Sequence, residues 1–122
     1  YYSNGTSHID FAFPWADIEN KTINELVKFT DAFLSPQHIT SMISKYMVLY
    51  EASKSLMVLR PYQIYAVEQI VHRAKTSDKN GYIWHTTGSG KTLTSFKASQ
   101  IMMQLPDVTK VLFVVDRNDL DT

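Results

Sequence analysis

The residues best placed to do chemistry lie in one short segment, residues 85–92, which reads His-Thr-Thr-Gly-Ser-Gly-Lys-Thr. Gly88 and Gly90 allow backbone torsions and close approaches that a Cβ would block. Lys91 supplies a flexible cation that can reach the β and γ phosphates of a nucleotide, and the Thr92 hydroxyl can ligate Mg²⁺. The sequence therefore predicts a site for a nucleoside polyphosphate.

The elements on either side of this segment favour the same interpretation. Residues 82–84 form a short apolar run typical of a strand, and a helix is predicted from about Lys91 to Gln104, ended by Pro106. A loop between them has to turn sharply and present backbone N–H groups and the positive end of a helix to an anion. This context makes the match to the phosphate-loop pattern G-x-x-x-x-G-K-[ST] far more specific than a chance run of small residues. His85 stands at the pattern's first glycine, where we expect it to shape the backbone or pack rather than to act in catalysis.

A second candidate group lies upstream, in the run Leu-Arg-Pro-Tyr-Gln at residues 59–63. The Gln63 amide has both a donor and an acceptor and can contact the N6 and N7 edge of adenine, while Arg60 or Tyr62 can stack on the ring. Arg60 also fits a simple helix start with Tyr62 in the core, and the two interpretations are compatible. The predicted nucleotide-binding residues are Arg60, Gln63, Thr87, Gly88, Ser89, Gly90, Lys91 and Thr92. Of these, Lys91 and Thr92 are the expected catalytic residues, with Thr92 holding Mg²⁺ through the nucleotide.

The N-terminal third is predicted to consist of a strand and two helices. Within residues 9–13, Ile9, Phe11 and Phe13 alternate with Asp10 and Ala12, which is typical of a short strand. A helix is predicted to begin at a capping box formed by Thr22 and Glu25. Ser35, as N-cap, begins a second amphipathic helix over residues 36–47.

The rest of the chain has the order of an α/β domain. Residues 48–59 fit either a connector or a loose hairpin of short strands. A third amphipathic helix follows over residues 61–74 and should stop in the polar run at 76–81. Residues 111–115 are continuous, apolar and β-branched, which is typical of a strand covered on both faces in a parallel sheet. Together with the strand and helix around the phosphate loop, this order predicts the opening of an α/β domain.

Composition narrows the class of protein. The 122 residues are 44% hydrophobic and have no net charge, which excludes disorder throughout and a generally basic nucleic-acid binder. The charge is uneven, because residues 51–100 carry a net +4 and the parts before and after carry −2 each. Without cysteine or a long apolar run, there is no disulfide framework and no transmembrane segment in this sequence. We expect a cytoplasmic protein, and the two chain ends suggest a segment of a longer one.

Three of these runs together resemble a known family. Residues 59–63, 82–94 and 111–117 are similar to the Q-like motif, motif I and motif Ia of superfamily 2 helicase-like translocases. The combination looks most like the R, or restriction, subunit of type I restriction-modification enzymes, in which His at the first glycine position is usual. The stretch from Asn20 to Leu34 also resembles the family's segment between its nuclease domain and its motor.

The resemblance implies a fold and a function. It implies a linker of mainly helical character over residues 1–58, including the end of the nuclease region, and the first part of a P-loop RecA-like lobe over 59–122, with an incomplete parallel sheet. It implies an ATP-driven, Mg²⁺-dependent motor on double-stranded DNA and an endonuclease that works with modification and specificity subunits. The Walker B acids, the arginine finger and the nuclease centre would then lie outside this sequence. Motif position places Arg117 and Asn118 near DNA, although a solvated helix start explains them equally well.

Two other functions stay open on the sequence alone. One is another superfamily 2 DNA or RNA helicase or remodeller, which would share the same three motifs. The other is a nucleotide-binding or interaction module without motor activity. An acidic group resembling a nuclease centre, Glu19 and Lys21 with Asp10 and Asp17, is predicted to be a coincidence because it lies in a polar run before a helix rather than on a strand.

Overall fold

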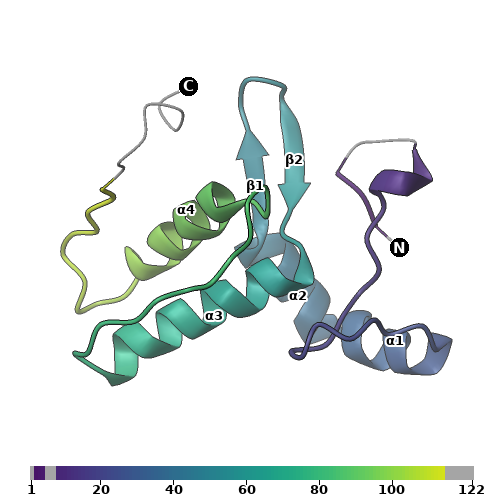
Figure 1. Cartoon of the computed structure of the whole chain (residues 1–122), viewed down its shortest axis with the longest axis horizontal. Helices are drawn as coiled ribbons and strands as arrows, with labels where there is room; N and C mark the ends of the chain where they lie inside the picture. The colour runs from purple at the N-terminus through teal and green to yellow at the C-terminus, as the bar shows by residue number, and fades with distance from the viewer. Residues whose placement is uncertain (1, 5–7, 115–122) are drawn as a thin grey trace. The chain divides into compact units, whose positions relative to one another are not determined.

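The structure is a computed structural model that describes residues 2–4 and 8–114 (Figure 1). Its elements, in chain order, are a 3₁₀ helix η1 (Ile9–Phe11), α1 (Leu26–Phe33), α2 (Pro36–Lys45), β1 (Met47–Tyr50), β2 (Ser55–Val58), α3 (Pro61–Thr76) and α4 (Lys91–Met102). Contacts divide the chain into two compact units, Tyr1–Tyr65 and Ala66–Thr122, with the boundary inside α3. No helix in the described residues is long and apolar enough to cross a bilayer.

The N-terminal strand predicted over residues 9–13 is wrong. That stretch contains η1 instead, in which the Ala12 N–H donates to the Ile9 carbonyl oxygen at 2.9 Å. This local hydrogen bond takes the place of cross-strand pairing. In the described structure, one residue of the predicted strand makes a strand-like pairing: Phe13 forms an isolated antiparallel bridge with Tyr2. An alternation of apolar side chains over only five residues is compatible with both a strand and a short helix.

The first predicted helix is present but begins later than the sequence indicated. α1 starts at Leu26, with Glu25 as its N-cap residue and no side-chain hydrogen bond capping it. The predicted capping box is therefore wrong. Thr22 forms an isolated antiparallel bridge with Ala16, so its backbone is held in an extended pairing rather than at a helix start.

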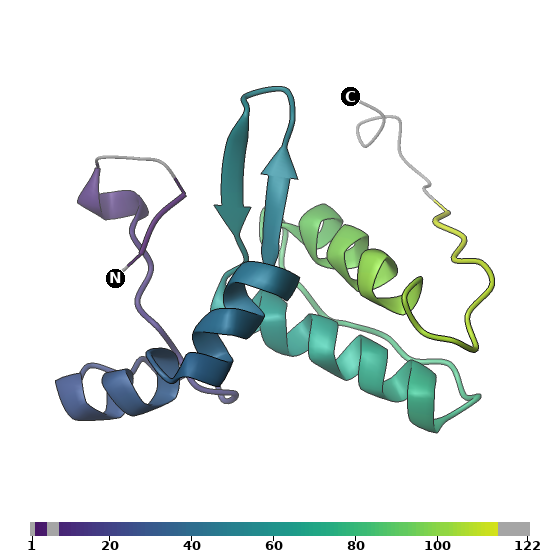
Figure 2. The same cartoon turned by 180° about the vertical axis from the view of Figure 1, so that it is seen from behind.

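The second helix confirms its predicted start. In α2 the Ser35 hydroxyl oxygen accepts a hydrogen bond from the His38 N–H at 3.3 Å, and Pro36 occupies the first turn. Both residues suit those positions, because serine satisfies an orphan N–H and proline has none to satisfy. α2 leads directly into β1, as the reverse view shows (Figure 2).

Residues 47–58 form a hairpin, which decides between the two alternatives for that stretch. β1 and β2 pair antiparallel in a register that places Met47 opposite Val58 and Tyr50 opposite Ser55. The hairpin projects as a two-stranded arm (Figure 1). Val48 is buried at its base, whereas Leu49 is exposed.

An aromatic cluster forms the core of the first unit. Trp15 is 3% exposed, and its ring lies 5.0 Å from that of Phe33 and 4.8 Å from that of His38, edge to face in both cases. Such pairs add stabilisation beyond the area that they bury. The cluster contains Tyr2, Phe13, Trp15, Phe29, Phe33, His38 and Tyr65. Burial raises the pKa of the Tyr2 hydroxyl, which donates to the Leu59 carbonyl oxygen at 3.0 Å.

The third predicted helix, α3, begins at Pro61 and ends at Thr76, where the polar run starts. Leu59, just before it, is completely buried, and Ile64 is 2% exposed. Arg73 lies in the last turn, where a cation interacts favourably with the helix dipole.

The parallel sheet predicted for the second unit is not among the described elements. Residues 82–84 and 111–114 belong to no helix or strand there, and Val115 lies outside the described residues. The first of these stretches runs alongside the C-terminal part of α3 in both views (Figures 1 and 2). Tyr82 is 89% exposed and Val114 is 92% exposed. A strand needs neighbours to complete its ladder, and no described segment pairs with these two, so only the mixed α and β character of the prediction is confirmed.

The helix after the phosphate loop begins where predicted, and it buries one face. α4 starts at Lys91 and ends at Met102, slightly before the expected end. Its buried residues, Thr94, Lys97 and Ala98, have the spacing of a single helix face. Burial lowers the pKa of the Lys97 ammonium, whose Nζ donates to the Gln100 side-chain oxygen at 3.0 Å.

Candidate functional site

The phosphate-loop segment is a tight turn that delivers the chain into α4. Gly88 and Gly90 both have φ of +75°, in the left-handed region where a Cβ is strained. A Cβ built on Gly88 would meet no atom within 4 Å, so the requirement for glycine at that position is conformational rather than steric. These two torsions turn the backbone between residue 87 and the first turn of the helix.

The Thr86 carbonyl oxygen organises the inside of the turn. It accepts hydrogen bonds from the Ser89 N–H at 3.3 Å, from the Ser89 hydroxyl at 2.7 Å and from the Lys91 ammonium at 2.9 Å. The lysine is thus folded back over its own loop. An ammonium has three donors, so Lys91 can keep Thr86 and still donate to phosphate oxygens.

The N-terminus of α4 is suited to an anion. Its N-cap residue, Gly90, has no side chain to cap the first turn, and no acidic residue occupies that turn. The first N–H groups of a helix have no intrahelical partner, and the dipole there is positive. In contrast, the Ser35 side chain caps the N-terminus of α2 by accepting a hydrogen bond from the His38 N–H. Of the two helices, α2 has a side-chain cap and α4 has none.

Exposure of the loop residues agrees with a binding role. Thr87, Gly88, Lys91 and Thr92 are exposed, whereas Ser89 is half-buried. His85 is also half-buried. A hollow of about 580 Å³ in the second unit lies elsewhere, between the end of α3 and residues 79–83. We assign the candidate site to the loop because that is where the donors and the cation meet.

The two upstream candidates, Arg60 and Gln63, lie together at the start of α3. The Arg60 N–H donates to Gln63 Oε1 at 2.8 Å, the back-hydrogen bond of a capping box. Gln63 is 4% exposed, and Tyr62 is half-buried. Arg60 and Gln63 belong to the first unit and the phosphate loop to the second.

A smaller pocket of about 230 Å³ adjoins these residues. Its walls come from two parts of the first unit that are distant in sequence, and they consist of Phe13, Pro14, Ala16, Asn20, Thr22, Arg60, Pro61 and Tyr62. The Arg60 guanidinium lies over the Phe13 ring, with its central carbon 3.8 Å from the ring centroid. This stacking on the Phe13 ring holds the flat, charged guanidinium of Arg60 in a fixed position.

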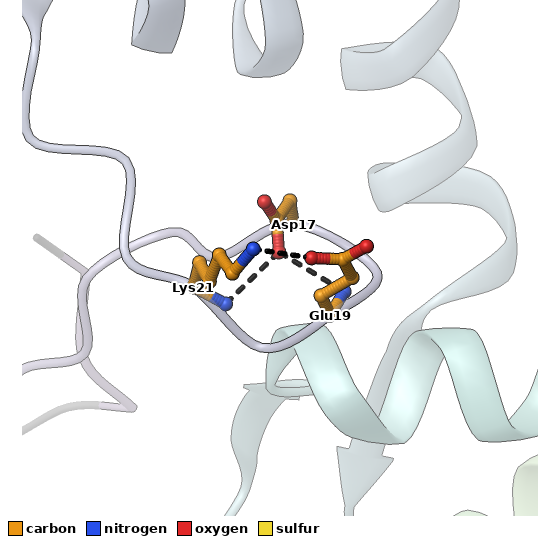
Figure 3. Close-up of polar contacts among 3 residues, drawn as sticks. All are labelled: Asp17, Glu19 and Lys21. Carbon is orange, nitrogen blue, oxygen red and sulfur yellow. Dashed lines mark hydrogen bonds and ion pairs between the residues drawn. The ribbon is translucent and has the colours of Figure 1, made fainter.

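The acidic group near the N-terminus organises a loop rather than a metal site. Asp17 Oδ1 accepts hydrogen bonds from the Glu19 N–H at 3.0 Å and the Lys21 N–H at 2.9 Å (Figure 3). The Lys21 ammonium pairs with the Glu19 carboxylate, and both side chains are largely exposed. Among the described residues, no group of three or more His, Asp or Glu side chains could hold a metal ion. Asp10 is exposed within η1.

Sequence reasoning missed two contributors. Thr86 acts through its carbonyl oxygen, which no side-chain pattern reveals, although its position inside the loop was a signal. Asn4 contacts the backbone of Val58, 54 residues away, and no local pattern could have found it. The predicted DNA contacts, Arg117 and Asn118, lie outside the described residues.

Comparison with known proteins places these features in a family context. Residues 62–122, half of the chain, match the SWI2/SNF2 ATPase family. The whole chain is similar to the endonuclease subunit of type I restriction enzyme SsaAORF53P from Staphylococcus saprophyticus, at 55% identity, and to that of SauCOLORF180P from Staphylococcus aureus, at 51%. It is 32% identical over 88% of its length to the HindI endonuclease subunit from Haemophilus influenzae. The chain spans 13%, 13% and 12% of these three relatives.

Proposed function

This chain belongs to the SWI2/SNF2 ATPase family, and from that membership we propose that its phosphate loop binds ATP with Mg²⁺. The observation that carries the proposal is the turn over residues 86–92. It ends at a helix N-terminus that has no capping side chain and no acidic residue in its first turn, with the Lys91 ammonium folded over it. Backbone donors, a positive helix end and a mobile cation are the three parts that a polyphosphate site needs.

Each loop residue has a distinct role in this proposal. Backbone N–H groups in the first turn of α4 donate to the phosphates, and the glycines let the phosphates approach. Lys91 would neutralise charge on the β and γ phosphates, and the Thr92 hydroxyl would hold Mg²⁺. The residues present fit such a metal, because an exposed hydroxyl in the first turn of α4 is a hard oxygen donor. The bound metal would supply charge neutralisation at the transferred phosphoryl group.

Arg60 and Gln63 are proposed to recognise an adenine base. Gln63 reads the N6 and N7 edge of adenine, and the Arg60 guanidinium offers a flat cation on which the ring can stack. The capping box supports this role, because its hydrogen bond at 2.8 Å fixes the direction of the Gln63 amide before any nucleotide binds. Groups that are already oriented lose less entropy on binding.

The proposal for the whole protein is a motor and endonuclease subunit of a type I restriction enzyme. It is supported by the similarity of the full chain to endonuclease subunits of such enzymes. In that protein, residues 59–122 open a RecA-like lobe whose parallel sheet takes up residues 82–84 and 111–115, and residues 1–58 join it to the nuclease region. Its substrate is double-stranded DNA, its partners are modification and specificity subunits, and Arg117 and Asn118 contact the DNA.

Cleavage of a supercoiled plasmid tests this proposal. The full-length protein that carries this sequence is assayed alone and with its modification and specificity partners, each with and without ATP. We expect cutting only in the assembled complex and only with ATP. Cutting by the subunit alone, or without ATP, would contradict the proposal. ATP hydrolysis without cutting in any combination would favour another helicase or remodeller.

A further inference from the structure

The link between β2 and α3 is held by side chains from the start of the chain. Asn4 uses both ends of its amide on a single residue: its Nδ2 donates to the Val58 carbonyl oxygen at 3.1 Å, and its Oδ1 accepts from the Val58 N–H at 2.7 Å. This pairing imitates the two hydrogen bonds that a neighbouring strand would make on the outer edge of β2. Asn4 therefore fixes the last residue of the strand.

The next two residues of the link are held in the same way. The Tyr2 hydroxyl donates to the Leu59 carbonyl oxygen at 3.0 Å. The Phe13 ring lies beneath the Arg60 guanidinium at 3.8 Å. Tyr2 and Phe13 are themselves joined by two backbone hydrogen bonds, of 2.9 and 2.6 Å. Three consecutive residues, 58–60, thus each have one partner in residues 2–13, which we call the N-terminal brace.

The brace leads by a short path to the Gln63 amide. Asn4 holds Val58, the chain continues through the buried Leu59, and the Arg60 N–H donates to Gln63 Oε1. Phe13 of the brace and residues 60–62 also form walls of the same pocket of about 230 Å³. A change in the position of residue 58 should therefore alter the direction of Gln63 and the shape of that pocket.

We propose that the N-terminal brace sets which base Gln63 prefers, with Asn4 acting as a positioning residue through Val58 and Arg60. This inference rests on the proposed role of Gln63 in reading adenine. Asn4 is exposed, so its substitution removes little apolar burial and acts mainly through the two hydrogen bonds. Substitution of Asn4 should therefore change recognition of the base more than the stability of the fold.

The test compares two asparagine substitutions in the full-length protein. Asn4→Leu keeps a side chain that is branched at Cγ and removes both hydrogen bonds to Val58. Asn24→Leu makes the same chemical change at an exposed position and is the matched control. Steady-state hydrolysis of ATP and GTP gives kcat and KM for each variant. Asn4→Leu should raise the KM for ATP by roughly three- to tenfold, the range expected for about one lost hydrogen bond.

The ratio of kcat/KM for ATP over GTP separates positioning from simple support of the fold. Asn4→Leu should lower this ratio while kcat at saturating ATP is unchanged, and Asn24→Leu should change neither. A variant that only loses folded protein lowers kcat for both nucleotides equally and leaves KM and the ratio unchanged. An unchanged ratio for Asn4→Leu would overturn the inference. The proposal of an ATP site is tested separately: it would be contradicted if the unsubstituted protein hydrolysed no ATP.

Discussion

The Lys91 ammonium donates a hydrogen bond to the Thr86 carbonyl oxygen at 2.9 Å, across the turn that precedes α4. The cation is therefore already held over the loop before a phosphate arrives. Because a lysine side chain in solution samples many rotamers, this contact reduces the entropy that binding a nucleotide would otherwise remove.

Replacement of Lys91 by Ala should abolish ATP hydrolysis. The change removes the one loop cation that can reach the β and γ phosphates, and loss of comparable charge stabilisation lowers kcat by roughly a hundredfold or more. Hydrolysis is measured by phosphate release from the full-length protein. Lys79→Ala removes an exposed lysine outside the loop and should retain activity. Wild-type turnover by the Lys91 variant would remove the basis for the phosphate-loop assignment.

Replacement of Gly88 by Ala should lower stability through backbone strain alone. Its φ of +75° lies in the left-handed region, where a Cβ costs about 1–2 kcal/mol, yet no atom lies within 4 Å of the added carbon. Gly81→Ala is the matched control, because its Cβ would meet Arg73 Cγ at an ordinary 3.9 Å. Urea unfolding of both variants measures the difference. Equal stability of the two would show that the loop does not need the left-handed torsion.

Lys97→Met should stabilise the protein at neutral pH, and the gain should shrink at high pH. Burial lowers the pKa of Lys97, so the folded state binds fewer protons than the unfolded state between that lowered pKa and the ordinary pKa of lysine. Stability of the unsubstituted protein therefore rises with pH in this window, and Met removes the dependence. Urea unfolding between pH 7 and pH 11 measures the difference, with the exposed Lys110→Met as control. A difference that stays constant with pH would contradict this expectation.

Glu19→Gln should leave DNA cleavage by the assembled enzyme unchanged. Its carboxylate forms an exposed ion pair with Lys21, and exposed pairs contribute little to stability. Asp17, the neighbouring acid, is already engaged as an acceptor for two backbone N–H groups. Plasmid cleavage and ATP hydrolysis are measured side by side. Loss of cleavage with intact hydrolysis would mean that this group belongs to the nuclease after all.

Local signals in the sequence predicted the elements that depend on near neighbours. Ser35 and Pro36 predicted the start of α2 because a cap is a contact between residues three apart. Gly88 and Gly90 predicted left-handed torsions for the same reason: few other residues tolerate them. The capping box predicted at Thr22 is wrong because the Thr22 backbone pairs with Ala16 instead. That pairing depends on a residue that lies outside the capping-box pattern.

Contacts between distant residues were beyond prediction from one sequence. Asn4 belongs to none of the patterns found in the sequence, yet its amide completes the edge of β2 at Val58. The strands predicted at 82–84 and 111–115 are not among the described elements, for a different reason. Their composition suits a buried parallel sheet, but composition does not supply the neighbouring strands that would let the described residues 82–84 and 111–114 form one.

The brace also has a consequence for the order in which the protein folds during synthesis. The Asn4 and Tyr2 side chains contact residues 54 and 57 positions further along the chain. Helices such as α1 and α2 need only local contacts and form quickly, whereas contacts between distant residues carry a loop-closure entropy cost. During translation, residues 2–4 must therefore wait until the ribosome has released residue 59. Residues 2–4 are therefore made well before the residues that they contact, and they are among the last of their unit to reach their final positions.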